Sequence, residues 1–154
     1  MNDEYFMEIA LTLAKKAYKK GEVPIGAIIV KDGKIISKAY NKREKTQNAN
    51  AHAELTAINK ACKKLKSWRL DGCTLYCTLE PCPMCAGAIV NSRIKKLVFG
   101  ACEPKSGSVC SKFNILTESG LNHTVEYKGG VKEDECSKII KDFFSDLRAQ
   151  SKIN

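Results

Sequence analysis

Two short motifs constrain this chain more than any other feature, because the side chains that they carry have to meet in space. The first, His-Ala-Glu, spans residues 52–54, and the second, Pro-Cys-Pro-Met-Cys, spans residues 81–85. An imidazole and two thiolates are typical Zn²⁺ ligands, and three protein ligands leave the fourth position for water, as in catalytic zinc sites. We therefore expect His52, Cys82 and Cys85 to bind one Zn²⁺, with two separate segments folded around it.

Glu54 is a carboxylate beside these ligands that the metal does not need. Zinc lowers the pKa of its bound water from about 16 toward about 7, and a nearby carboxylate can take that proton and deliver it to a leaving amine. Residues two apart on a helix point about 200° apart, so His52 and Glu54 share a pocket only across the first turn. We predict a helix over 53–65 with His52 at its N-terminus and Glu54 as the catalytic acid and base.

Pro83 predicts a second helix, because proline is favoured at the first helical position. Cys82 then lies at the cap, and Cys85 lies within the first turn of a helix that runs to about residue 91. Two positive helix ends converge on the metal in this arrangement, which favours bound thiolate and hydroxide. A buried histidine or a surface carboxylate is the commoner outcome for either residue alone, but the combined pattern favours a zinc site.

The remaining hydrophobic periodicity predicts helices and strands in alternation. Helices are expected over 3–20 and 131–150, and strands over 24–30, 35–40, 73–79, 95–99 and 123–127. Lys-Asp-Gly-Lys at 31–34 is a strong hairpin signal, so the sheet is expected to be mixed. Strands that alternate with helices indicate a sheet covered on both faces, with ligands at the carboxyl edge of its strands.

Length and composition place the chain among globular proteins. With 154 residues, 44% of them hydrophobic, we expect a single domain over 1–154 with its own core. No run of 18 apolar residues is present, and the acidic start lacks the features of a secretory signal, so we expect a cytoplasmic protein without a membrane anchor.

Positive charge is concentrated in the first half of the chain. Residues 1–70 hold 15 Lys and Arg against 7 Asp and Glu, whereas residues 71–154 hold 11 against 10, for a net charge of +9. Such lysines can form a phosphate-binding surface for a nucleic acid, or they can simply be solvated on surface helices.

Eight cysteines are present, two of them assigned to the metal. Four others are expected to fill the core: Cys62, Cys73, Cys77 and Cys136. Cys102 and Cys110 flank a short loop, and a second metal pair, an oxidisable pair or two unpaired thiols are all open, with unpaired thiols favoured.

The two motifs resemble the His-x-Glu and Pro-Cys-x-x-Cys signature of zinc nucleobase deaminases, and the similarity to the bacterial tRNA-specific adenosine deaminase family extends over nearly the whole chain. That resemblance implies an α/β fold, the three-layer α/β/α cytidine-deaminase-like fold with a central mixed sheet of about five strands. It also implies a homodimer with one Zn²⁺ per subunit. The implied reaction is hydrolytic deamination of adenosine to inosine at the wobble position (position 34) of an arginine tRNA anticodon.

In that family the wobble nucleotide is extruded into the pocket, the activated water attacks C6, and the carboxylate that matches Glu54 protonates N1 and then the departing ammonia. The resemblance assigns substrate contacts to Asn41, Ala53, Glu103, Lys105, Asn122, Phe144 and Arg148. Each has a plain structural alternative, such as a turn asparagine or a solvated charge. Phe144 is preferred over Phe143 because Phe143 lies on the apolar stripe of its helix. Glu103 stands where the family usually has aspartate. The way in which this loop contacts the anticodon therefore does not follow from the resemblance.

Three alternatives stay open at this point. A deaminase of free guanine, free cytosine or a small nucleoside would use the same zinc site. A non-catalytic zinc-containing RNA-binding partner is a second possibility, against which Glu54 argues, because a scaffold needs no proton shuttle. A structural zinc module is the third, and the size of the core argues against it.

Overall fold

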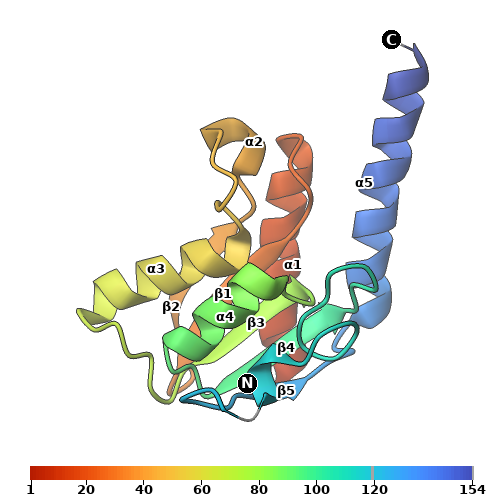
Figure 1. The fold of residues 1–154 in the computed structure, drawn as a ribbon. Helices are drawn as coiled ribbons and strands as arrows, with labels where there is room; N and C mark the ends of the chain where they lie inside the picture. Colours follow the sequence, from red (N-terminus) through yellow and green to blue (C-terminus); the bar gives the residue numbers. More distant parts are fainter. Residues whose placement is uncertain (119, 154) are drawn as a thin grey trace.

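The computed structural model describes residues 1–118 and 120–153 and consists of a five-stranded sheet with helices on both sides (Figure 1). The strands are β1 (Gly26–Lys31), β2 (Lys34–Tyr40), β3 (Thr74–Leu79), β4 (Lys96–Ala101) and β5 (Glu126–Lys128). The helices are α1 (Asp3–Lys19), α2 (Arg43–Thr46), α3 (Ala53–Leu65), α4 (Pro83–Asn91) and α5 (Glu133–Ile153), with a 3₁₀ turn η1 (Ile115–Thr117).

The sheet is mixed, as the sequence predicts. Its strand order is β2-β1-β3-β4-β5, with β1 antiparallel to β2 and β3, and with β3, β4 and β5 parallel. The hairpin between β1 and β2 turns at Asp32 and Gly33, which both have positive φ (51° and 75°). Two consecutive positive φ angles are typical of a type I′ turn, whose twist matches that of the flanking strands. This turn fixes Lys31 opposite Lys34.

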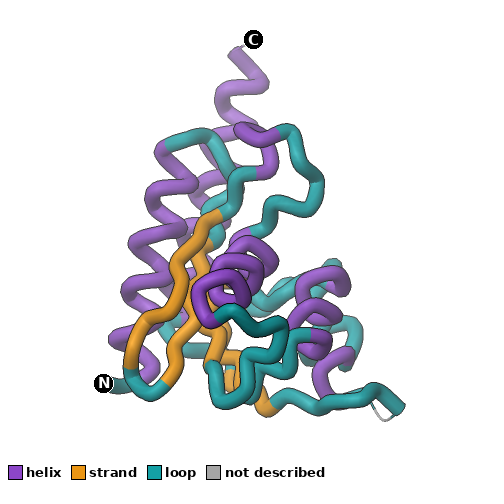
Figure 2. Tube along the Cα trace, turned by 90° about the vertical axis from the view of Figure 1, so that its left-hand side faces the viewer, coloured by secondary structure: helices purple, strands orange, loops and turns teal. Residues whose placement is uncertain are grey.

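Alternation along the strands divides the core between the two faces of the sheet. On β1, Ala27 and Ile29 pack in one buried cluster, and Ile28 and Val30 pack in the other, because successive strand residues point to opposite faces. The first cluster includes residues of α3 and α4, and the second includes residues of α1 and α5. Figure 2 shows the strands between helices on their two sides, which is the predicted α/β/α layering.

Close contact between α1 and the sheet requires glycine at position 26. A Cβ atom there would lie 2.0 Å from the carbonyl oxygen of Ala10 and 2.8 Å from the amide nitrogen of Ala14. Such contacts are far below van der Waals distance, so any side chain would push α1 away from β1. Three of the cysteines expected to fill the core are fully buried, whereas Cys62 is only half-buried.

The carboxyl ends of β3 and β4 and the N-termini of α3 and α4 lie at the same edge of the sheet. Beside this edge, α5 runs past the sheet, and its C-terminal half extends away from the other elements (Figure 1). Among the residues that the structure describes, every helix is too short or too polar to cross a membrane.

Candidate active site

The two motifs place an imidazole and two thiols together at two helix ends. His52 is the N-cap of α3, and Cys82 is the N-cap of α4, where Pro83 takes the first helical position. The Nδ1 atom of His52 lies 3.6 Å from Sγ of Cys82 and 3.7 Å from Sγ of Cys85. In a tetrahedral zinc site with Zn–S of about 2.3 Å and Zn–N of about 2.0 Å, ligand atoms lie about 3.5–3.8 Å apart. The donor set and its spacing therefore fit a zinc ion.

The protonation of these groups reflects their close contact. The hydrogen bond from the Cys85 thiol, and after it the bond with His52, lowers the pKa of the Cys82 thiol to about 4. The same contact with the Cys82 thiolate raises the pKa of Cys85, and the hydrogen bond with Cys82 raises the pKa of His52. The Cys85 thiol therefore holds its proton more strongly than the Cys82 thiol. A cation that binds both has to displace the Cys85 proton.

Glu54 is enclosed by protein, with 3% of its surface exposed. Burial, and after it the negative charge of the Cys82 thiolate, raises the pKa of Glu54 to about 7. Its Oε1 atom has no hydrogen-bond partner among the residues that the structure describes. Buried carboxylate oxygens are nearly always bonded, and perturbed carboxyl groups of this kind are characteristic of sites that move protons.

Three adjoining cavities surround Phe144. The first, of about 190 Å³, contains His52 and Cys82 of the candidate metal-binding cluster in its wall and is lined by Val23, Ile25, His52, Glu54, Leu79, Glu80, Cys82, Glu103, Ser106, Ile140 and Phe144. The second, of about 250 Å³, is lined by Gly21, Glu22, Val23, Asn41, Arg43, Glu44, Phe143, Phe144 and Leu147. The third, of about 410 Å³, is lined by Lys105, Ile140, Lys141, Phe144 and Arg148.

The residues that sequence reasoning assigned to substrate are divided among these cavities. Glu103 lines the first, Lys105 and Arg148 line the third, and Phe144, 38% exposed, lines all three. Phe143 is 8% exposed and packs edge-on against Tyr18.

The three other predicted contacts differ in their surroundings. Asn41 lines the second cavity, but its side chain already donates to the Val23 carbonyl (3.3 Å) and accepts from the Arg43 amide (3.2 Å). Ala53 is fully buried in the first turn of α3 and lines none of the three cavities. Asn122 is exposed and lines none of the three cavities.

Sequence reasoning missed two buried carboxylates that hold the walls of these cavities. Glu22 accepts the amides of Glu44 (2.9 Å) and Lys45 (2.7 Å) and so binds the N-terminal turn of α2. Glu80 accepts several amides of the loop after β4, and although burial raises its pKa, these hydrogen bonds lower it overall. The only sequence signal for Glu80 is its place directly before the second motif.

Comparison with known proteins agrees with this arrangement. The fold and the cluster at its helix ends define a deaminase, and residues 1–148 match the model of the MafB19-like deaminase family. The tRNA-specific adenosine deaminase of Bacillus subtilis is 53% identical over 150 residues, which cover 97% of this chain and 93% of that protein. This chain belongs to the tRNA-specific adenosine deaminase family, as its motifs indicated.

Two solved structures extend the comparison. A chain from a study of A-to-I editing by tRNA:A34 deaminases at the wobble position of transfer RNA is 41% identical with a TM-score of 0.85, covering 88% of this chain and 98% of its own length. The guanine deaminase of Bacillus subtilis is 39% identical with a TM-score of 0.63, covering 83% of this chain and 85% of that one. The first similarity confirms the predicted three-layer fold with its mixed sheet, and the second shows that a deaminase of a free base shares it.

Proposed function

We propose that this protein hydrolyses the 6-amino group of adenosine at position 34 of a tRNA anticodon, releasing ammonia and leaving inosine in the RNA. The observation that carries this proposal is the His-Cys-Cys cluster beside a buried carboxylate, Glu54, whose Oε1 has no hydrogen-bond partner among the described residues. His52, Cys82 and Glu54 line one cavity. The tRNA-specific adenosine deaminase of Bacillus subtilis supports adenosine in tRNA as the substrate. The similarity to a structure from work on tRNA:A34 deaminases supports the wobble position.

His52, Cys82 and Cys85 would hold Zn²⁺, which when bound supplies an activated water. Glu54 performs the proton transfers. Its raised pKa lets the carboxyl gain and lose a proton near neutral pH. Glu54 would take a proton from the attacking water and pass it to N1 of the adenine. It would then take the second proton from the hydroxyl group on C6 and pass it to the departing amine, which leaves as ammonia. Because Glu54 is buried, bulk water has little access to its carboxyl group during these transfers.

The cavities around Phe144 suit a polynucleotide better than a free base. The exposed ring of Phe144 offers a stacking surface for an unpaired base. Lys105, Lys141 and Arg148 bring three positive charges to one adjoining cavity, where a phosphate of the RNA backbone can bind. Arg43 lines another of the cavities that Phe144 borders.

Other proposed features rest on the family. We propose that Asn41, Ala53, Glu103 and Asn122 also face the RNA, that the substrate is an arginine tRNA and that the protein acts in the cytoplasm as a homodimer. Light scattering of the purified protein tests the dimer, and a panel of purified tRNAs with adenosine at position 34 tests the choice of tRNA. A monomer at all concentrations, or equal rates on all these tRNAs, would contradict the respective statement.

Deamination of a free base is the second candidate, because a guanine deaminase shares the fold at 39% identity. The deciding experiment incubates the purified protein with an anticodon stem-loop carrying adenosine at position 34, with the same RNA carrying guanosine there, and with free guanine and free cytosine. We expect inosine only from the first RNA. Ammonia from the free bases alone would establish the second candidate, and RNA binding without any turnover would indicate a non-catalytic partner.

A further inference from the structure

Glu80 lies at the end of β3, two residues before Cys82, and is 2% exposed. Its Oε2 atom accepts the amides of Val109 (3.1 Å), Cys110 (2.9 Å) and Ser111 (3.0 Å). Its Oε1 atom accepts the amide of Glu103 (3.1 Å) and the Ser111 hydroxyl. Five donors thus meet one carboxylate, which has about four lone-pair directions to offer. The side chain has no acceptor capacity left for a metal or a substrate.

The segment that Glu80 holds, residues 102–111, follows β4 and has no helix or strand of its own. Gly107 packs directly against the carboxylate, because a Cβ atom there would lie 2.5 Å from Oε1 of Glu80 and 2.4 Å from the carbonyl of Glu103. The Ser108 amide donates to the carbonyl of Pro81 (2.9 Å). The 102–111 loop is therefore folded around the Glu80 side chain, which directly follows β3.

Side chains of this loop line the cavities where we propose that the RNA binds. Glu103 and Ser106 line the cavity that His52, Glu54 and Cys82 also line, and Lys105 lines the neighbouring basic cavity. Lys105 itself is exposed, and its amide donates to Oε1 of Glu103 (2.9 Å). The positions of these three side chains therefore depend on how the loop backbone is held.

We propose that Glu80 is a positioning residue for RNA binding, which fixes the 102–111 loop so that Glu103 and Lys105 face the polynucleotide next to the reacting base. The inference rests on the proposed function, because it needs an RNA substrate. Glu80 lines the same cavity as His52, Glu54 and Cys82, but loop donors occupy both of its oxygens, so it acts through the loop. Its loss is therefore expected to affect substrate binding more than the chemical step.

The Glu80→Gln variant tests this proposal, because it keeps the size of the side chain and replaces one acceptor oxygen with a donor that faces amide N–H groups. On the anticodon stem-loop with adenosine at position 34, we expect KM to rise about tenfold while kcat stays within about twofold of the parent, since binding contacts and not the reacting groups are disturbed. Zinc content should stay that of the parent. Hydrogen exchange should quicken at the amides of residues 103 and 109–111.

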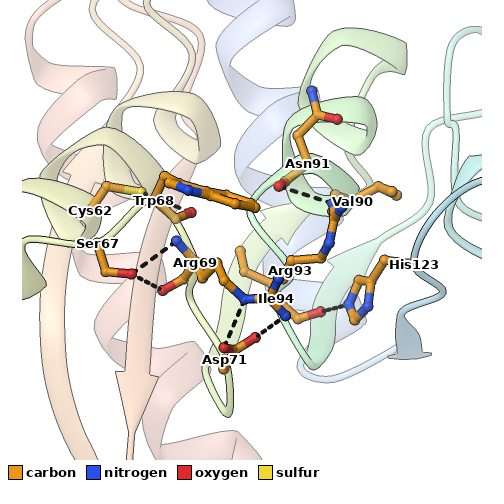
Figure 3. Close-up of polar contacts among 10 residues, drawn as sticks. All are labelled: Cys62, Ser67, Trp68, Arg69, Asp71, Val90, Asn91, Arg93, Ile94 and His123. Atoms are coloured by element: carbon orange, nitrogen blue, oxygen red, sulfur yellow. Dashed lines mark hydrogen bonds and ion pairs between the residues drawn. The ribbon is translucent and has the colours of Figure 1, made fainter.

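The matched control is Asp71→Asn, the same carboxylate-to-amide change at an exposed position. Asp71 accepts from Arg69 (Nε to Oδ2 3.1 Å) beside Trp68, at a cluster that includes Arg93 and His123 (Figure 3). None of these residues lines the three cavities around Phe144. We expect KM and kcat of this variant to match the parent.

A double-mutant cycle separates positioning from a general loss of stability. If Glu80 acts by placing Lys105, the rise in KM caused by Glu80→Gln should shrink in a Lys105→Ala background. The inference would be overturned if the two substitutions changed KM additively. It would also be overturned if Glu80→Gln left KM unchanged or lowered kcat alone. If Glu80→Gln gives no folded protein, Ser111→Ala removes one of the five donors, and a KM equal to that of the parent would overturn it.

The parent protein distinguishes failure of this inference from failure of the proposed function. Turnover of the stem-loop by the parent with an unchanged KM in Glu80→Gln overturns the positioning role alone. Absence of turnover by the zinc-loaded parent overturns the proposed function and this inference together.

Discussion

We expect Glu54 to be needed for turnover and to lower the stability of the fold when it is ionised. The Glu54→Gln variant tests both effects. Glutamine keeps the shape of the protonated side chain and removes the charge. The pKa of Glu54 rises from 4.5 to about 7 in the folded protein because of burial. One pKa unit corresponds to about 1.4 kcal/mol, so the ionised side chain destabilises the metal-free fold by up to about 3 kcal/mol.

The sign of the pH dependence follows from the direction of the shift. Below the unfolded pKa of 4.5, Glu54 is protonated in both the folded and the unfolded form, so its ionisation does not lower the free energy of unfolding. As pH rises toward about 7, the unfolded form loses its proton first, so the stability of the parent falls relative to the glutamine variant. We expect Glu54→Gln to be more stable above pH 7 by up to about 3 kcal/mol, and this gain to vanish near pH 4.5.

Urea unfolding of the chelator-treated proteins at several pH values measures this difference. Glu126→Gln, at an exposed position on β5, is the control and should show no gain that grows with pH. Zinc-loaded Glu54→Gln should bind metal and RNA like the parent and lose turnover at least about 100-fold, the usual contribution of a general acid and base. A variant no more stable than the parent at high pH, or one with near-native turnover, would refute the reasoning.

Three further predictions concern the metal and the aromatic pair. Cys85→Ser should lower zinc content and turnover together, and full zinc occupancy by metal analysis would remove Cys85 from the ligand set. Zinc affinity should fall as pH falls, since the raised pKa values of Cys85 and His52 make protons compete with the metal. Competition with a chelator at several pH values measures this affinity, and an affinity that does not change with pH would contradict the prediction. Phe144→Ala should raise KM for the stem-loop with little change in melting temperature, whereas Phe143→Ala should destabilise the fold by about 3–5 kcal/mol; equal effects of both on either quantity would contradict this division.

Local sequence signals accounted for the parts of the site that depend on local geometry. Pro83 predicts the start of α4, which runs Pro83–Asn91 as expected. Placing His52 at a helix N-terminus follows from its spacing to Glu54, and it is the N-cap of α3. The turn at 31–34 likewise predicts the hairpin, because glycine there adopts positive φ.

The parts that the sequence did not reveal depend on contacts between distant residues. The short helix α2 has no apolar periodicity, and its first turn is held by the carboxylate of Glu22, more than 20 residues earlier in the chain. Glu80 binds amides 23 to 31 residues away. Neither carboxylate belongs to a helical or strand pattern, so only the folded structure shows which loops they hold.

Zinc-dependent turnover of the same RNA tests the central claim most directly. The protein is stripped with a chelator, reloaded with measured amounts of Zn²⁺ and assayed for inosine in the anticodon stem-loop. The account predicts inosine formation that is absent in the stripped protein and rises in proportion to zinc until one ion is bound per chain. Full activity in protein shown by metal analysis to be free of zinc would contradict it.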